Sequence, residues 1–229
     1  MFRVKTEKAR AIAKQLFGTA LLLGLALAMA ALLLFGWLAE DVLEGEKQHF
    51  DEAIRALVQE HATPALTAAM RVITLLGSTA FLLALGLLIT LIFLVVKWKR
   101  SAMLITFTMA GAFLLNWVLK ISFQRERPTP FFDTPLPDSY SFPSGHALLS
   151  FCFYGALASI ISARTRSLAL RIVTWAAAIL LAVAIGISRV YLGVHYPSDV
   201  MAGFAAAVMW IITTAVVDRF VLLRKQRLD

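Results

Sequence analysis

The sequence has few charged residues and almost no cysteine. Charged residues make up only 16% of the 229 positions, whereas 60% are hydrophobic, and this balance is too apolar for an ordinary water-soluble domain. The single cysteine, Cys152, cannot form a disulfide within the chain, and a metal site built on cysteines is excluded. Because Cys152 stands inside an apolar run, we interpret it as a small core residue.

Six stretches contain no charged residue at all, and they predict membrane-spanning helices. A helix needs roughly 17 to 25 residues to cross a bilayer, and each stretch is long enough. The predicted spans are Gln15–Ala39, Val72–Val96, Ser101–Leu119, Ala147–Ala163, Ile172–Ser188 and Val200–Val217. We therefore expect an all-α, polytopic membrane protein with six transmembrane helices, which form a single integral membrane domain over residues 1–229.

A cleavable signal peptide is the alternative interpretation of the first stretch. The segments 26–28 and 28–30 have the A-x-A pattern of a cleavage site. The apolar run nevertheless continues to Leu38, so cleavage would leave an apolar remnant at the new N-terminus. We interpret this stretch as a true span.

The net charge of +8 would suit a nucleic-acid-binding protein, but the positions of the charges favour a membrane protein. Fifteen of the 22 Lys and Arg residues lie in segments 1–14, 97–100, 164–171 and 218–229, which contain only three of the 14 acidic residues. If the N-terminus is cytoplasmic, six spans place all four segments in the cytoplasm, in agreement with the positive-inside rule. We therefore expect both termini in the cytoplasm, a location in the cell membrane and no nucleic-acid partner.

The segment 40–71 is acidic and lies on the outer side in this topology. Within it, hydrophobic residues recur at the spacing of an amphipathic helix. These residues are Phe50, Ala53, Ile54, Leu57 and Val58. We expect an extracytoplasmic helix that either contacts lipid headgroups or packs on the bundle, and we expect Pro64 to begin the helix of the second span. The nearby His49 and His61 are interpreted as surface residues.

Irregular backbone is concentrated on the same outer side. Five of the seven prolines stand in the segment 121–145, and the other two also fall on this side. Binding and catalytic residues are disproportionately found in such loops. We therefore expect the functional site on the extracytoplasmic face.

Three cations stand at the outer ends of different spans: Lys120, Arg127 and Arg189. Charges beside a span are costly and usually functional, and several cations with few acids nearby indicate a multiply charged anion such as phosphate. Ser144 and Gly145, at the expected start of a helix, would add a hydroxyl and free backbone N–H groups to this site. Snorkelling toward headgroups is an alternative role for Lys120, but it does not explain the whole set.

Two histidines belong to the same region. His195 and Asp199 are spaced i, i+4, so the carboxylate can hold one ring nitrogen and leave the other as a neutral nucleophile. His146, at another helix start, can act as a general acid. These residues alone leave open which histidine attacks. A metal site of two histidines and one aspartate is the competing interpretation, which we reject because three neighbouring cations would repel a divalent metal.

Three motifs follow one another here: Lys120-x6-Arg127-Pro128, then Pro143-Ser144-Gly145-His146, then Ser188-Arg189-x5-His195-x3-Asp199. In their order and without a substitution, they resemble the signature of the type 2 phosphatidic acid phosphatase (PAP2) superfamily. With the six predicted spans, the resemblance extends over nearly the whole chain. The superfamily also contains soluble vanadium-dependent haloperoxidases, but six spans in 229 residues argue against that branch and favour the small bacterial lipid phosphatases.

The resemblance implies a metal-independent phosphatase that needs no cofactor and works through a phosphohistidine. His195 would attack phosphorus with support from Asp199, and His146 would protonate the departing oxygen. The phosphoryl oxygens would be held by Lys120, Arg127, Ser144, Gly145 and Arg189. Water would then cleave the phosphohistidine.

A site at the outer interface suits a phosphate on a lipid, because the tail can stay in the bilayer. The resemblance makes undecaprenyl diphosphate and phosphatidylglycerophosphate the first candidate substrates. Two alternatives stay open, a lipid phosphotransferase with a polyprenyl diphosphate donor and a non-enzymatic lipid-binding or transport protein of the same fold. Arg125 is expected either to meet a second phosphate or headgroup or to pair with Glu126. The sequence leaves the oligomeric state undecided.

Overall fold

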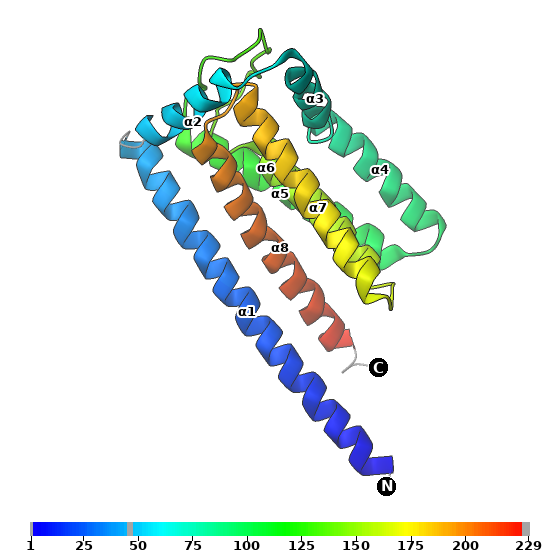
Figure 1. Cartoon of the computed structure of the whole chain (residues 1–229). Coiled ribbons are helices and arrows are strands. Elements are labelled where there is room, and N and C mark those ends of the chain that lie inside the picture. Colours follow the sequence, from blue (N-terminus) through cyan, green and yellow to red (C-terminus); the bar gives the residue numbers. More distant parts are fainter. Residues whose placement is uncertain (1, 45–47, 226–229) are drawn as a thin grey trace.

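The computed structural model describes residues 2–44 and 48–225, and all the regular structure in these residues is α-helical (Figure 1). In chain order the helices are α1 (Phe2–Glu44), α2 (Gln48–Glu60), α3 (Pro64–Leu75), α4 (Thr79–Val95), α5 (Lys99–Phe123), α6 (Gly145–Ser162), α7 (Leu168–Tyr191) and α8 (Pro197–Lys225). The predicted all-α class is confirmed.

Five of these helices contain an apolar segment long enough to cross a membrane. The segments are parts of α1 and α8 and the whole of α5, α6 and α7. A sixth crossing is formed only if α3 and α4, which are bent by 46° relative to each other, count as one span. The described residues thus provide five or six candidate spans, at the places predicted from the sequence.

The prediction of one continuous helix through Val72–Val96 is wrong. Pro64 does begin α3, but the backbone N–H groups of residues 76–78 bond to carbonyl oxygens three residues back, which ends that helix. Ser78 then begins α4 as its N-cap, because its side chain accepts a hydrogen bond from the N–H of Phe81. The break lies inside the charge-free stretch Val72–Val96, so it leaves the hydropathy of that stretch unchanged.

Helix ends differ from the ends of the charge-free stretches. α5 and α7 continue beyond the predicted spans, so that Lys120 and Arg189 lie in their last turns. α8 begins at Pro197, a residue suited to the first helical position, and Asp199 therefore lies in its first turn. α1 begins well before the predicted Gln15. Candidate site residues are thus part of regular helix ends, which fixes their backbone.

α6 lies at the centre of the bundle between α5, α7 and α8, and α1 runs along α8 (Figure 1). A close approach of α8 to α6 depends on Gly203, because a Cβ at this position would lie 2.7 Å from the carbonyl oxygen of Ser144. Ala202 and Ala206 of α8 are fully buried on either side of this glycine. These small residues bring the first turns of α6 and α8 together, as expected for closely packed helices in a membrane.

α2 and the loop 124–144 lie at one end of the bundle, whereas the start of α1 and the end of α8 lie at the other (Figure 1). α2 is the predicted amphipathic helix. Its residues Ile54 and Val58 pack against Val190 of α7 and Val200 of α8, so the helix packs on the bundle. The extracytoplasmic position of α2 and the cytoplasmic position of the termini remain predictions.

Candidate active site

The candidate site residues lie at the end of the bundle that carries α2 and the loop 124–144. They are Lys120 near the end of α5, Arg127 in the loop, Ser144, Gly145 and His146 at the start of α6, Arg189 in the last turn of α7, His195 in the link to α8, and Asp199 in the first turn of α8. The side chains are close enough to be coupled electrostatically. His146, for example, is coupled to four of them: Arg189, His195, Arg127 and Lys120.

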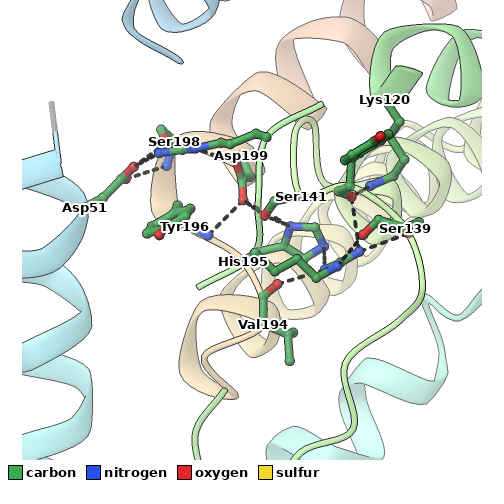
Figure 2. Close-up of polar contacts among 12 residues, drawn as sticks. Asp51, Lys120, Ser139, Ser141, Val194, His195, Tyr196, Ser198 and Asp199 are labelled. Atoms are coloured by element: carbon green, nitrogen blue, oxygen red, sulfur yellow. Dashed lines mark hydrogen bonds and ion pairs between the residues drawn. The ribbon is translucent and has the colours of Figure 1, made fainter. Parts of the chain in front are cut away.

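His195 is held by Asp199, and both side chains are buried (Figure 2). Nδ1 of His195 lies 3.2 Å from Oδ2 of Asp199. The same oxygen accepts a hydrogen bond from the hydroxyl of Ser141 and another, of 2.9 Å, from the backbone N–H of Tyr196. Because Asp199 is the third residue of α8, its bond to the N–H before the helix is one half of a capping box. The start of α8 therefore fixes the carboxylate that orients the ring.

The contacts of His195 also determine where its proton lies. Nη1 of Arg127 is 3.1 Å from Nε2 of His195, and a guanidinium can only donate. Nε2 must therefore carry the lone pair, and Nδ1 carries the hydrogen that faces Asp199. Burial of the ring is the largest effect on the pKa of His195 and lowers it to about 3, against the raising effect of Asp199. At neutral pH the ring is neutral and Nε2 is available as a nucleophile.

Carbonyl oxygens of the surrounding loops hold two of the three predicted cations. Arg127 donates from Nε to the carbonyl oxygen of Ser139 at 2.7 Å and from Nη1 to that of Val194 at 2.8 Å. Lys120 donates from Nζ to the carbonyl oxygen of Tyr140 (Figure 2). Burial lowers the pKa of Arg127, but a guanidinium remains charged in proteins. Both cations are thus fixed beside His195.

The first turn of α6 is suited to an anion. The N-cap Ser144 makes no side-chain capping bond, and its Oγ is buried without a hydrogen-bond partner in the part of the chain that the structure describes. The first N–H groups of a helix have no partner within the helix, and the helix dipole favours negative charge there. At the start of α8, by contrast, carboxylates already accept the N–H groups of Tyr196 and Ser198. An anion is therefore better accommodated at the start of α6 than at the start of α8.

The third cation, Arg189, extends this surface from α7. Its Nη1 donates to Oγ1 of Thr74 in α3 at 2.8 Å, which anchors the guanidinium. Its Nε is buried and has no hydrogen-bond partner among the described residues. His146 is half-buried and packs on Gly77 at the break between α3 and α4, where a Cβ would lie 3.3 Å from Cδ2 of the ring. The end of α3 and the break that follows it thus form one wall of the site.

The region that contains these residues matches a known protein family. The model of the PAP2 superfamily matches residues 101–221, which include all eight predicted site residues. The chain belongs to the PAP2 superfamily. It is accordingly a phosphatase, and its apolar helices embed it in a membrane.

Several characterised PAP2 proteins are similar to this chain. Phosphatidylglycerophosphatase B of Bacillus subtilis is 36% identical over 180 residues, which cover 77% of this chain and 87% of that protein. A crystal structure of a transmembrane PAP2 type phosphatidylglycerolphosphate phosphatase from Bacillus subtilis superposes with a TM-score of 0.78 at 31% identity, covering 85% of this chain and 96% of that one. An undecaprenyl-diphosphatase of Sulfolobus acidocaldarius is 33% identical over 124 residues, about half of each chain (51% and 55%).

Lipid A phosphatases also belong to these relatives. Lipid A 1-phosphatase of Rhizobium johnstonii is 35% identical over 133 residues, which cover 54% of this chain and 50% of that protein. Enzymes named for different lipid phosphates are therefore similar to this chain.

Arg125 makes contacts that its position in the sequence did not suggest. Its guanidinium forms ion pairs with Asp199 at 2.7 Å and with Asp51 at 2.9 Å, and not with the neighbouring Glu126. Burial acts to lower the pKa of Arg125, but the two carboxylates prevail and raise it above its ordinary value. Ser141, whose hydroxyl bonds to Asp199, was likewise not recognised.

A signal for Asp51 was present in the sequence. Asp51 and Arg55 are spaced with Ile54 and Val58 on the face of α2 that packs on the bundle, and both charged side chains are buried there. A carboxylate on the apolar face of an amphipathic helix needs a buried partner. Sequence reasoning could have found the need for a partner, although not which residue supplies it.

Proposed function

We propose that this protein removes phosphate from a membrane lipid phosphate or diphosphate through a phosphohistidine at His195, without a metal ion. The supporting observation is the geometry of His195. Its Nε2 lone pair faces Arg127, its Nδ1 faces the buried carboxylate of Asp199, and its ring stays neutral at neutral pH. A neutral imidazole that is held this way beside an anion-binding surface is equipped to attack phosphorus.

The first half-reaction forms a bond between Nε2 and phosphorus. The lone pair of Nε2 attacks while the bond from phosphorus to the lipid oxygen breaks. His146, which the negative charge of the bound phosphate would keep protonated, gives its proton to that oxygen. The ring of His195 becomes cationic, and the carboxylate of Asp199 at Nδ1 offsets the new charge. Arg127, Arg189 and Lys120, with the first turn of α6, hold the phosphoryl oxygens.

The second half-reaction restores the enzyme. His146, now neutral, takes a proton from a water molecule whose oxygen attacks phosphorus. The bond between phosphorus and Nε2 breaks, its electron pair returns to His195, and inorganic phosphate leaves. Because His146 has regained its proton, the next cycle can begin.

The substrate that we propose first is phosphatidylglycerophosphate, followed by undecaprenyl diphosphate. The relative that covers 77% of this chain is named for the first activity, and a relative that covers 51% is named for the second. We further propose that the site opens on the extracytoplasmic face of the cell membrane and that both termini lie in the cytoplasm, which the distribution of basic residues supports.

Phosphate release from purified protein in detergent tests this proposal. Each of the two lipids is offered in the presence of EDTA, and the variant His195→Ala is compared with His61→Ala, which changes an exposed histidine directly after α2. We expect release that resists EDTA, persists in His61→Ala and falls at least ~10³-fold in His195→Ala, since removal of a nucleophile has effects of this size. Release that EDTA abolishes, or that His195→Ala retains, overturns the phosphohistidine mechanism.

The fate of the phosphoryl group separates hydrolysis from the alternatives. With radiolabelled lipid, hydrolysis yields inorganic phosphate as the only labelled product. Label that moves to a second lipid would identify a phosphotransferase. Tight lipid binding with no labelled product, by protein that is folded, would identify a binding protein and would overturn the proposal.

A further inference from the structure

We propose that Asp51 of α2 and Arg125 of the loop 124–144 are positioning residues for the catalytic carboxylate Asp199. The inference rests on the proposed function of the His195–Asp199 pair. It adds a helix that lies outside the matched superfamily region 101–221 to the apparatus that orients the nucleophile.

A continuous chain of buried and part-buried contacts leads from α2 to the nucleophile, and Figure 2 shows its ends, Asp51 and His195. Oδ2 of Asp51 accepts a hydrogen bond from Nη2 of Arg125 at 2.9 Å. Nη1 of Arg125 donates to Oδ1 of Asp199 at 2.7 Å and to the hydroxyl of Ser198 at 2.8 Å. Oδ2 of Asp199 in turn faces Nδ1 of His195 at 3.2 Å. Each end of the Arg125 guanidinium is thus tied to a carboxylate.

Arg125 holds the oxygen of Asp199 that the other partners leave free. The hydroxyl of Ser141, the N–H of Tyr196 and Nδ1 of His195 all reach Oδ2. Without a donor at Oδ1, the carboxylate could turn about its own axis and exchange its two oxygens. The bond from Arg125 therefore fixes the carboxylate plane, and with it the direction in which the ring of His195 points.

Asp51 fixes Arg125 and the start of α8 together. Its side chain is 0% exposed, its Oδ1 accepts the backbone N–H of Ser198 at 2.9 Å, and its Oδ2 accepts the hydroxyl of the same residue. A carboxylate at a helix N-terminus is favourable because it satisfies a free N–H and opposes the helix dipole. Asp199 belongs to the same first turn of α8. Asp51 therefore fixes both the backbone that carries Asp199 and the guanidinium that bonds to it.

Other contacts keep α2 in register with this site. Arg55, one turn after Asp51, donates to the carbonyl oxygen of Gly193 at 3.2 Å and to that of Thr129 at 2.9 Å. The guanidinium of Arg125 also lies over the ring of Tyr196, 4.0 Å from its centroid. α2 is therefore docked on the link before α8 and on the loop 124–144, the two segments that carry His195 and Arg125.

The pairing with Asp51 also has an electrostatic consequence. When His195 becomes phosphorylated its ring carries positive charge, which Asp199 must offset. An Arg125 without Asp51 would direct its whole charge at Asp199 and weaken that effect. Because Asp51 and Asp199 share one guanidinium, Asp199 keeps negative charge that can offset the positive charge of the His195 ring.

Isosteric substitution tests the proposal with a matched control on the same helix. Asp51→Asn removes the buried charge, whereas Glu52→Gln removes the charge of the next residue, whose side chain is 59% exposed and forms only a long ion pair of 3.6 Å with Arg55. Full-length protein in detergent is assayed with phosphatidylglycerophosphate and, in parallel, with undecaprenyl diphosphate. We expect Asp51→Asn to lower kcat about 10- to 100-fold with KM changed less than about 3-fold, and Glu52→Gln to leave both within about 2-fold.

A second variant and a second readout separate positioning from folding. Arg125→Lys keeps the charge but lacks the planar group whose two nitrogens bond to Asp199 and Asp51 separately, and it should also lower kcat about 10-fold or more. Activity is expressed per folded molecule, and rapid-quench trapping measures the rate of phosphohistidine formation, which should fall with kcat. The double variant should lose little more than the worse single variant, because both act through Asp199.

The outcomes distinguish this inference from the proposed function. If His195→Ala is inactive but Asp51→Asn and Arg125→Lys both match Glu52→Gln per folded molecule, the positioning role is overturned and the phosphohistidine mechanism stands. The positioning role is also overturned if these variants lose activity only because part of the protein is unfolded, while the folded protein forms phosphohistidine at the original rate. Activity that survives in His195→Ala would overturn the proposed function itself.

Discussion

Nη1 of Arg127 lies 3.1 Å from Nε2 of His195, the atom that we propose attacks phosphorus. The same guanidinium is anchored by the carbonyl oxygens of Ser139 and Val194, so its position does not depend on the histidine. In the proposed mechanism, an oxygen of a bound phosphate would accept the hydrogen bond that Arg127 now directs at Nε2, and the lone pair of Nε2 would then be free to attack phosphorus.

The protonation state of His195 can be measured directly by ¹⁵N NMR of histidine-labelled protein. Protonation of His195 would block the attack on phosphorus. Because burial lowers the pKa of His195 to about 3, the neutral form should persist as the pH falls and be lost only near that value. At pH 5 about 99% of His195 should be neutral, against about 3% for a histidine with the ordinary pKa of 6.5. We expect hydrogen on Nδ1 and no titration between pH 8 and 5, with signals assigned by His195→Ala. Titration near pH 6.5 would contradict the buried, neutral nucleophile.

Ser141 should contribute to activity through Asp199. Replacing it by alanine removes the hydroxyl that donates to Oδ2 of Asp199. The same hydroxyl lies 3.3 Å from Nδ1 of His195. A hydrogen bond to a charged group contributes about 1.5–3 kcal/mol, so kcat should fall about 10- to 100-fold in Ser141→Ala. Ser122→Ala is the control, since this exposed hydroxyl donates only to the carbonyl oxygen of Val118 in its own helix. Equal kcat values in the two variants would show that Oδ2 does not need the serine.

Gly193 should be intolerant of a side chain. Its φ of +72° suits glycine, and a Cβ would lie 2.6 Å from the backbone nitrogen of Phe131, which itself bonds to Leu192. Gly193→Ala should therefore displace the loop 124–144 from the link that carries His195, lowering both kcat and the melting temperature in detergent. Strain of this kind costs about 1–3 kcal/mol. Gly36→Ala, where nothing lies within 4 Å of the added Cβ, should change neither kcat nor the melting temperature. A Gly193→Ala variant with the original kcat and melting temperature would argue against the strained link.

The proposed sidedness can be tested without removing the native cysteine. Cys152 is 0% exposed and should not react with a membrane-impermeant maleimide. Cysteines are introduced singly at His61, after α2, and at Arg166, between α6 and α7, both of which are exposed. In intact spheroplasts we expect His61→Cys to be labelled and Arg166→Cys to be labelled only after permeabilisation. The reverse pattern would place the site in the cytoplasm.

Hydropathy located the spans because a bilayer tolerates few charges on a helix, but it located their ends poorly. Lys120 and Arg189 interrupt the apolar stretches, whereas backbone hydrogen bonding continues past them and places both in helical last turns. Hydropathy also does not reveal the break at Leu76–Ser78, since the residues on both sides of it are apolar. It depends on a capping bond made by Ser78, which a charge-free run does not reveal.

The candidate site could be predicted where its residues are close in the chain or belong to a recognised motif. His195 and Asp199 are one helical turn apart, and their spacing alone predicts contact. Asp51 and Arg125 are 74 positions apart, and their pairing depends on how α2 packs across the bundle. Tertiary packing of this kind has no local signature, so a buried acid on an amphipathic helix can be recognised but its partner cannot be assigned.

The distance in sequence between Asp51 and its partner Ser198, 147 positions, has a consequence for biogenesis. During synthesis α2 and Arg125 both leave the ribosome before the first turn of α8 exists, and until then Ser198 is not available to the carboxylate of Asp51. Nascent chains that stop before α8 would therefore lack the two hydrogen bonds that Ser198 donates to Asp51, as well as Asp199 itself. A cell that inserts this protein stepwise would hold an inert intermediate, and the catalytic centre would be assembled only when the last helix enters the membrane.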